Sequence, residues 1–168
     1  MKKDINIRQV QYDAEETFQT GGFYCSEAIM SSIRKNIDPT MPEALIAAAS
    51  GFPIGVGRSK CICGAISGGV LALGYFFGKD KSTDGTNKKS MELANELQQS
   101  FRKNHQGVSC CHIHTKGMDM ANGEHKKQCV AFTGEMAAKT AEIIARELDL
   151  KVLHNDDCSP GITLGDSI

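Results

Sequence analysis

The chain has 168 residues, of which 40% are hydrophobic and 23% charged, and its formal net charge is −1. This length suits one domain with its own core, and the near-neutral balance does not favour nucleic acid as a partner. The first residues include two lysines but no apolar run behind them. We therefore expect no secretion signal and a cytoplasmic protein.

Apolar residues recur at helical spacing through most of the chain, and no alternating run longer than three or four residues predicts a strand. Glycine pairs, prolines and polar runs mark the expected helix ends. The predicted helices cover, in chain order, residues 7–18, 23–37, 43–49, 63–77, 90–104 and 126–148. This pattern predicts an all-α, single-domain helical bundle. We expect residues 1–148 to form the helical domain and residues 149–168 to be a tail packed on its surface.

The segment 61–78 carries no charged residue and contains five glycines and a serine. Its length lies at the short limit for a membrane span, and its composition favours a central helix buried inside the bundle. We therefore predict a buried, glycine-rich central helix and no membrane partner.

The chain contains seven cysteines but no C-x-x-C pair of the zinc-knuckle type. In a reducing compartment, stable disulfides are rare and thiols are more often metal ligands or redox groups. Cys25, Cys63 and Cys129 fall at predicted helix starts, where backbone N–H groups stabilise an anion. Spacing alone leaves three options open: an iron–sulfur cluster, another metal, or a thiol–disulfide site.

The order and surroundings of four cysteines add a resemblance. Cys25 lies in a Tyr-Cys-Ser-Glu-Ala helix start, and the motif 63–68 reads Cys-Gly-Ala-Ile-Ser-Gly. Cys111 and Cys129 follow at the expected places. This set resembles the family named for its C-GCAxxG-C-C cysteine pattern, which is described as redox-active and whose module also occurs in split-Soret cytochromes c. The resemblance covers roughly residues 18–148.

In the split-Soret relatives the module accompanies an iron–sulfur cluster, so the resemblance implies thiolate ligands at Cys25, Cys63, Cys111 and Cys129. It also suggests a homodimer, the commonest oligomer. The motif departs from the family name, since cysteine precedes glycine here. No C-x-x-C-H occurs, so covalent c-type haem is not expected.

Cys61, Cys110 and His112 are secondary candidates for metal binding. Because Cys110 stands beside Cys111, the sequence does not decide which of the two is the ligand. Cys158 is additional to the four-cysteine pattern. No Ser-His-Asp order or paired carboxylate site can be argued, so no catalytic residue is assigned. We expect an electron-transfer protein more than a substrate-converting enzyme.

The sequence therefore predicts a cysteine-ligated iron–sulfur cluster, preferably two-iron, that takes part in one-electron transfer with an unidentified donor and acceptor. Two alternatives remain. The first is a thiol–disulfide protein or sensor in which Cys61 and Cys63, or Cys110 and Cys111, cycle between dithiol and disulfide. The second is a non-redox binder of a soft metal.

Overall fold

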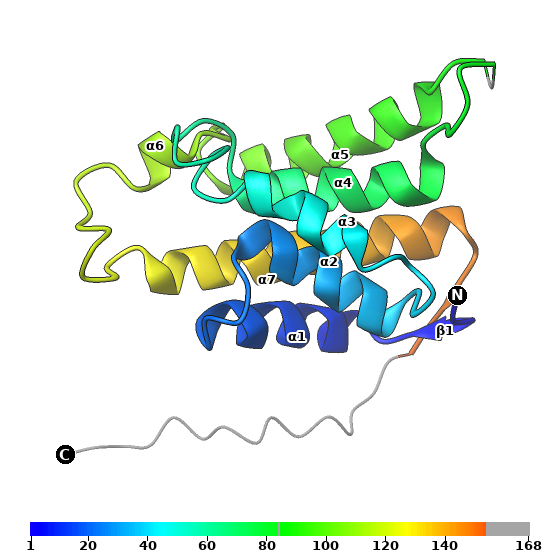
Figure 1. Cartoon of the computed structure of the whole chain (residues 1–168), viewed down its shortest axis with the longest axis horizontal. Helices are drawn as coiled ribbons and strands as arrows, with labels where there is room; N and C mark the ends of the chain where they lie inside the picture. Colours follow the sequence, from blue (N-terminus) through cyan, green and yellow to red (C-terminus); the bar gives the residue numbers. More distant parts are fainter. Residues whose placement is uncertain (84, 154–168) are drawn as a thin grey trace.

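Helices make up most of the described chain, which comprises residues 1–83 and 85–153 of a computed structural model (Figure 1). The elements in chain order are β1 (Asp4–Ile5), α1 (Ile7–Gln19), α2 (Cys25–Asn36), α3 (Ala44–Ala48), the 3-10 helix η1 (Ala49–Gly51), α4 (Gly64–Phe77), α5 (Lys88–Asn104), α6 (Cys111–His114), α7 (Lys126–Glu147) and β2 (Lys151–Val152). The all-α prediction is confirmed. Each predicted helix lies within two residues of the observed bounds, and among the described residues the short helices α6 and η1 were not predicted.

The five long helices lie roughly side by side, and their directions decide where their ends meet. In Figure 1, α2, α4 and α7 run from left to right, while α1 and α5 run the opposite way. The starts of α2, α4 and α7 therefore gather at one end of the bundle, where α6 also lies. Because a helix start carries partial positive charge, this end is suited to hold anionic groups.

The core is built from the apolar stripes of these helices. Helix α1 packs mainly on α7 and α2, and α4 packs on α2, α5 and α7. Large side chains with at most 1% of their surface exposed fill the space between them; they include Ile29, Ile33, Ile66, Leu97, Phe101 and Met136. The helical periodicity seen in the sequence thus corresponds to real buried faces.

Helix α4 is the central helix, and its small residues let neighbouring helices approach closely. A β-carbon on Gly68 would come within 2.7 Å of the Ser26 α-carbon in α2, and one on Gly69 within 2.5 Å of the Thr140 hydroxyl in α7. Residues 64–69 are all buried. The second half is less covered than we expected, because Tyr75 is 37% exposed and borders an outer groove of ≈550 Å³.

Strands β1 and β2 form a small parallel sheet at the other end of the bundle. The sequence did not predict this sheet. Asp4 pairs with Lys151 and Ile5 with Val152. Leu150 and Val152, which follow the last helix, also pack against the core. The remainder of the predicted tail, with Cys158, lies outside the described residues. Among the described helices, none has the length and apolar character needed to cross a membrane.

Candidate metal and redox site

Four cysteines from different parts of the chain line one small cavity. Cys25 is the first residue of α2, Cys63 directly precedes α4, Cys111 is the first residue of α6, and Cys129 lies in the first turn of α7. The cavity that they share measures ≈60 Å³. Pockets for organic ligands are usually several hundred cubic ångströms, so this space suits a small inorganic group or direct thiol chemistry.

The cavity wall requires glycine at one position. A β-carbon on Gly64 would come within 2.5 Å of the Cys25 sulfur, 3.2 Å of the Phe52 carbonyl oxygen and 3.3 Å of the Pro53 α-carbon. Only a residue without a side chain lets the start of α4 approach the Cys25 thiol this closely. The glycine after Cys63 thus brings two of the four sulfur-bearing residues together.

A short antiparallel pairing fixes which cysteine of the 110–111 pair faces the cavity. The Cys63 N–H donates to the Ser109 carbonyl at 2.9 Å, and the Cys111 N–H donates to the Cys61 carbonyl at 2.7 Å. Ile62 is paired with Cys110. Side chains alternate between the faces of such a pairing. Cys111 accordingly lines the cavity, and the Cys110 thiol donates instead to the Lys60 carbonyl at 3.2 Å.

The loop that leads into this pairing has an unusual backbone. The φ angles of Ile54, Val56 and Arg58 are 54°, 61° and 68°, and the glycines between them are also positive. Branched side chains strongly disfavour this left-handed region. Ile54 nevertheless lines the thiol cavity. A conformation of this kind persists only where surrounding contacts impose it, and it occurs most often at functional sites.

Burial controls the protonation of the four thiols. It is the largest cause that raises the pKa of each: to about 11 for Cys63, to about 12 for Cys129, and above its usual value for Cys25 and Cys111. The pKa values of Cys25, Cys63 and Cys129 are also raised by the charge of at least one other cavity cysteine, which reflects their proximity, whereas the pKa of Cys111 is raised by its chain neighbour Cys110. Without a bound cation the thiols are therefore neutral at pH 7, and a metal would have to displace their protons.

Several donors are placed to stabilise thiolates once they form. Backbone N–H groups of Ala65 and Ile66 favour the ionised form of Cys63, and that of Ser26 favours ionised Cys25. The Thr115 side chain does the same for Cys111. Such hydrogen bonds to sulfur tune the potential of a thiolate-ligated centre.

No three His, Cys, Asp or Glu residues of the described chain are spaced to hold a single metal ion. A one-ion site of the structural zinc type requires all ligand atoms about 2.0–2.3 Å from one point. The four cysteines that line the cavity supply thiolates, which are soft ligands.

A comparison with protein-family models matches residues 23–143 to the family described as "Putative redox-active protein (C_GCAxxG_C_C)". The match covers well over half of the chain. The chain belongs to the C-GCAxxG-C-C family. No curated protein and no solved structure gives a significant match.

The cysteines that the sequence resemblance singled out, Cys25, Cys63 in the 63–68 motif, Cys111 and Cys129, all lie at the end of the bundle where three helices begin. The departure in the motif moves glycine to the position after the cysteine. Gly64 there meets the Cys25 sulfur, which gives the change a physical role in this chain. Whether these cysteines bind a metal stays a prediction.

The secondary candidates of the C-GCAxxG-C-C chain lie outside the cavity wall. Cys61 and His112 are exposed. His114 is not a free loop residue, because its ring packs against Phe101 and Phe132 and its Nε2 lies 3.1 Å from the Val108 carbonyl oxygen.

Tyr24, Gly64 and Ala65 of the two quoted motifs also line the cavity, and sequence reasoning missed the rest of the wall, which comprises Phe18, Ile54, Met120 and His125. The most informative of these is His125, one turn before Cys129 in α7. Its Nδ1 is buried and has no hydrogen-bond partner among the described residues. The i, i+4 spacing of a histidine and a cysteine was the signal that could have identified it.

Proposed function

We propose that this protein is a redox protein that holds an iron–sulfur cluster, preferably two-iron, on Cys25, Cys63, Cys111 and Cys129, and that it serves in one-electron transfer. The observation that carries the proposal is the shared cavity of ≈60 Å³, which four cysteines from separate elements line. Iron–sulfur clusters are held by four cysteine thiolates, and these may be scattered in sequence if the fold assembles them. When bound, the cluster would supply a site that takes up and gives back one electron.

The protein's own groups provide the other requirements of such a centre. The starts of α2, α4 and α7 face this end of the bundle, and their partial positive charge offsets the charge of thiolates. The positive charge of Lys60 lowers the pKa of Cys111. Cys63 and Cys111 are buried and Cys25 and Cys129 half-buried, which limits water at the sulfurs and so helps set the potential.

The test is anaerobic reconstitution with ferrous iron and sulfide, followed by assay of iron and acid-labile sulfide and by a visible spectrum. We expect about two irons and two sulfides per chain, with visible absorption. Cys111→Ser should abolish cluster formation, and the neighbouring Cys110→Ser should not. Stoichiometric zinc, or no iron after reconstitution, would contradict the proposal. Equal loss in both variants would contradict the assignment of Cys111.

A thiol–disulfide function is the second candidate, and the difference in exposure within the cysteine pairs favours it. Cys61 is exposed while Cys63 is buried, so an oxidant could reach one thiol and leave the other to close the bridge. The reconstitution assay separates the two functions. A colourless, metal-free protein whose thiols oxidise reversibly in pairs would support this candidate, and stoichiometric zinc would support a soft-metal binder.

The predicted homodimer and the cytoplasmic location are part of the same proposal. Two-fold pairing is the commonest assembly, and the family resemblance suggested it. Light scattering at micromolar concentration tests it. A mass of 18.2 kDa, that of one chain, would contradict the dimer and leave the redox assignment unaffected.

A further inference from the structure

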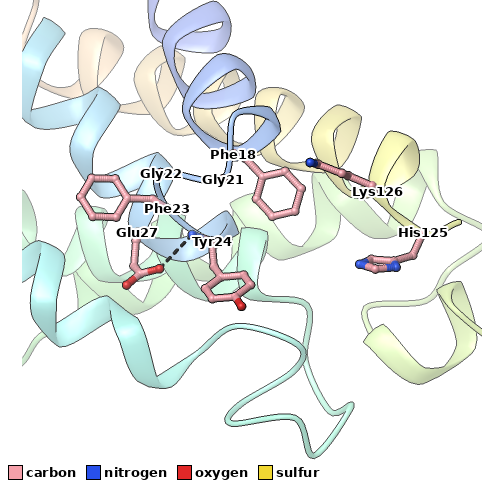
Figure 2. Close-up of a pocket in the computed structure, with 8 residues that line it drawn as sticks. All are labelled: Phe18, Gly21, Gly22, Phe23, Tyr24, Glu27, His125 and Lys126. Carbon is pink, nitrogen blue, oxygen red and sulfur yellow. Dashed lines mark hydrogen bonds between the residues drawn. The ribbon is translucent and has the colours of Figure 1, made fainter. Parts of the chain in front are cut away.

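An open pocket lies directly beside the thiol cavity. It has a volume of ≈430 Å³ and is formed by the end of α1, the turn into α2 and the start of α7 (Figure 2). Its lining residues are Phe18, Gly21, Gly22, Phe23, Tyr24, Glu27, His125 and Lys126. Three of them, Phe18, Tyr24 and His125, also line the thiol cavity. This volume falls in the range typical of small-molecule sites.

Aromatic side chains line much of the pocket. Figure 2 shows the rings of Phe18 and Tyr24 descending from the α1–α2 turn, with His125 pointing towards Tyr24 from the start of α7. Tyr24 is 53% exposed, so one face of its ring is open to the pocket that it lines. Aromatic rings in such an arrangement favour a planar aromatic partner through stacked and edge-to-face contacts.

The start of α7 is positively charged and lacks compensation. Lys126 and Lys127 occupy its first turn, which contains no acidic residue. Cations at a helix start are unfavourable because the helix dipole is positive there. The Lys126 ammonium makes no hydrogen bond or ion pair within the described residues. An anionic group bound in the pocket would relieve both unfavourable interactions.

The carboxylate on the opposite wall does not supply that anion. Glu27 accepts a hydrogen bond from the Tyr24 N–H at 2.9 Å through one oxygen, and one from the Ser50 hydroxyl at 2.5 Å through the other. It serves as a cap for α2 and is held at that helix start, as Figure 2 shows. The charge of the pocket is thus separated, with the carboxylate engaged on α2 and the free cation on α7.

His125 provides an independent sign that a partner is missing. Buried polar atoms nearly always have a hydrogen-bond partner, whereas its Nδ1 has none among the described residues. The residue stands between the open pocket and the thiol cavity. A polar group on a bound molecule would give this ring a partner after a small rotation.

We propose that this pocket binds a small planar aromatic molecule that carries an anionic group. The aromatic body lies between Phe18 and Tyr24, and the anion faces Lys126 and the start of α7. The ligand is then separated from the four thiols by the side chains that both cavities share. This binding goes beyond the proposed redox function and needs no metal in the protein.

The test uses 2-naphthoate as the probe and the full chain without added metal. A ¹H–¹⁵N NMR titration should shift the amides of Gly21, Gly22 and Lys126 with a dissociation constant of about 1 mM or lower, the range for a ligand of this size. The neutral 2-naphthamide should bind about twofold to fivefold more weakly, as expected for one partly exposed charge contact. The non-planar anion decahydronaphthalene-2-carboxylate should also bind more weakly.

Two lysine variants form a matched pair. Lys126→Gln should remove the preference for naphthoate over naphthamide, and Lys127→Gln, one residue away and outside the pocket, should keep it. The proposal is overturned if saturating naphthoate leaves the three pocket amides unshifted, if acid and amide bind equally, or if both variants lose the preference to the same extent. All of these outcomes are independent of whether iron is incorporated.

Discussion

The Cys25 sulfur lies against the backbone of Gly64, so closely that a β-carbon on that glycine would come within 2.5 Å of it. This contact joins the first residue of α2 to the first residue of α4. It makes the position of one thiol depend on the absence of a side chain elsewhere in the chain. The cavity is thus a product of helix packing as much as of the cysteines themselves.

Gly64→Ala should disturb both stability and the site. The added methyl group meets the Cys25 sulfur and the backbone of Phe52 and Pro53, which cannot all move away. We expect a loss of about 1–3 kcal/mol in the free energy of unfolding, typical of overpacking, together with reduced iron uptake. Urea denaturation and iron assay measure the two effects. Gly51→Ala is the control, because among the described residues no atom beyond its chain neighbours lies within 4 Å of its β-carbon position. Equal behaviour of the two variants would refute the contact.

Gly68→Leu tests the close packing of α4 on α2. The backbone of Ser26 occupies the space that a side chain would need, so we expect a loss of about 1–3 kcal/mol. Gly74→Ala on the same helix should instead gain about 0.5–1 kcal/mol, because its β-carbon position is open and alanine is the better helix former. Thermal unfolding of the two variants compares them. A Gly68→Leu protein as stable as the parent would show that this face is not packed as described.

Val56→Gly should stabilise the protein even though it removes an apolar side chain. Val56 is 43% exposed and has a φ of 61°, so it contributes little burial and costs conformational strain. We expect a gain of about 1 kcal/mol, the usual cost of the left-handed region for a residue with a side chain. Val56→Ala should gain much less, since alanine keeps the β-carbon. Denaturant midpoints decide between them, and a destabilised glycine variant would contradict the prediction.

Thr140→Val should also stabilise, because the buried Thr140 hydroxyl lacks a hydrogen-bond partner in the described structure. Replacing it with a methyl group of similar shape removes a desolvation cost of about 1–3 kcal/mol. Thr133→Val is the matched control in the same helix. Its hydroxyl donates to the Cys129 carbonyl at 2.7 Å, so that variant should lose stability. Calorimetry measures the change in stability of each variant. A change of the same sign in both would contradict the different hydrogen bonding of the two hydroxyl groups.

Asp38 should make folding sensitive to acid. Hydrogen bonds from Thr40, and one from the Tyr75 hydroxyl at 2.9 Å, help hold its pKa at about 2, below the ordinary 3.8. Because the folded-state pKa is the lower one, this stabilisation is complete above the unfolded-state value and is lost as pH falls from about 4 to 2. Asp38→Asn should lower stability at pH 7 and flatten the dependence in that window. Urea denaturation at pH 7, 4 and 3 measures the free energy of unfolding of the parent and the variant. If this free energy depends on pH equally in both proteins, the prediction is wrong.

Helix positions could be predicted from the sequence because the apolar spacing, Gly21-Gly22 and Asp38-Pro39 act locally. The choice between Cys110 and Cys111 could not, since it depends on a pairing between residues 60–63 and 109–112 that forms only in the fold. His125 has a sequence signal in its i, i+4 spacing from Cys129, but its place in the cavity wall depends on the path of the chain between α6 and α7, which has no periodic pattern.

The pairing of α1 with α7, and of β1 with β2, has a consequence for how the protein is made. Helix α1 leaves the ribosome long before α7, its main packing partner, has been synthesised, so the part of α1 that packs on α7 and not on α2 stays uncovered until translation is nearly complete. Contacts between residues so distant in sequence also slow folding, because a large loop must close first. A nascent chain arrested before residue 126 should therefore remain sensitive to protease at its N-terminus, and release of the full chain should protect it.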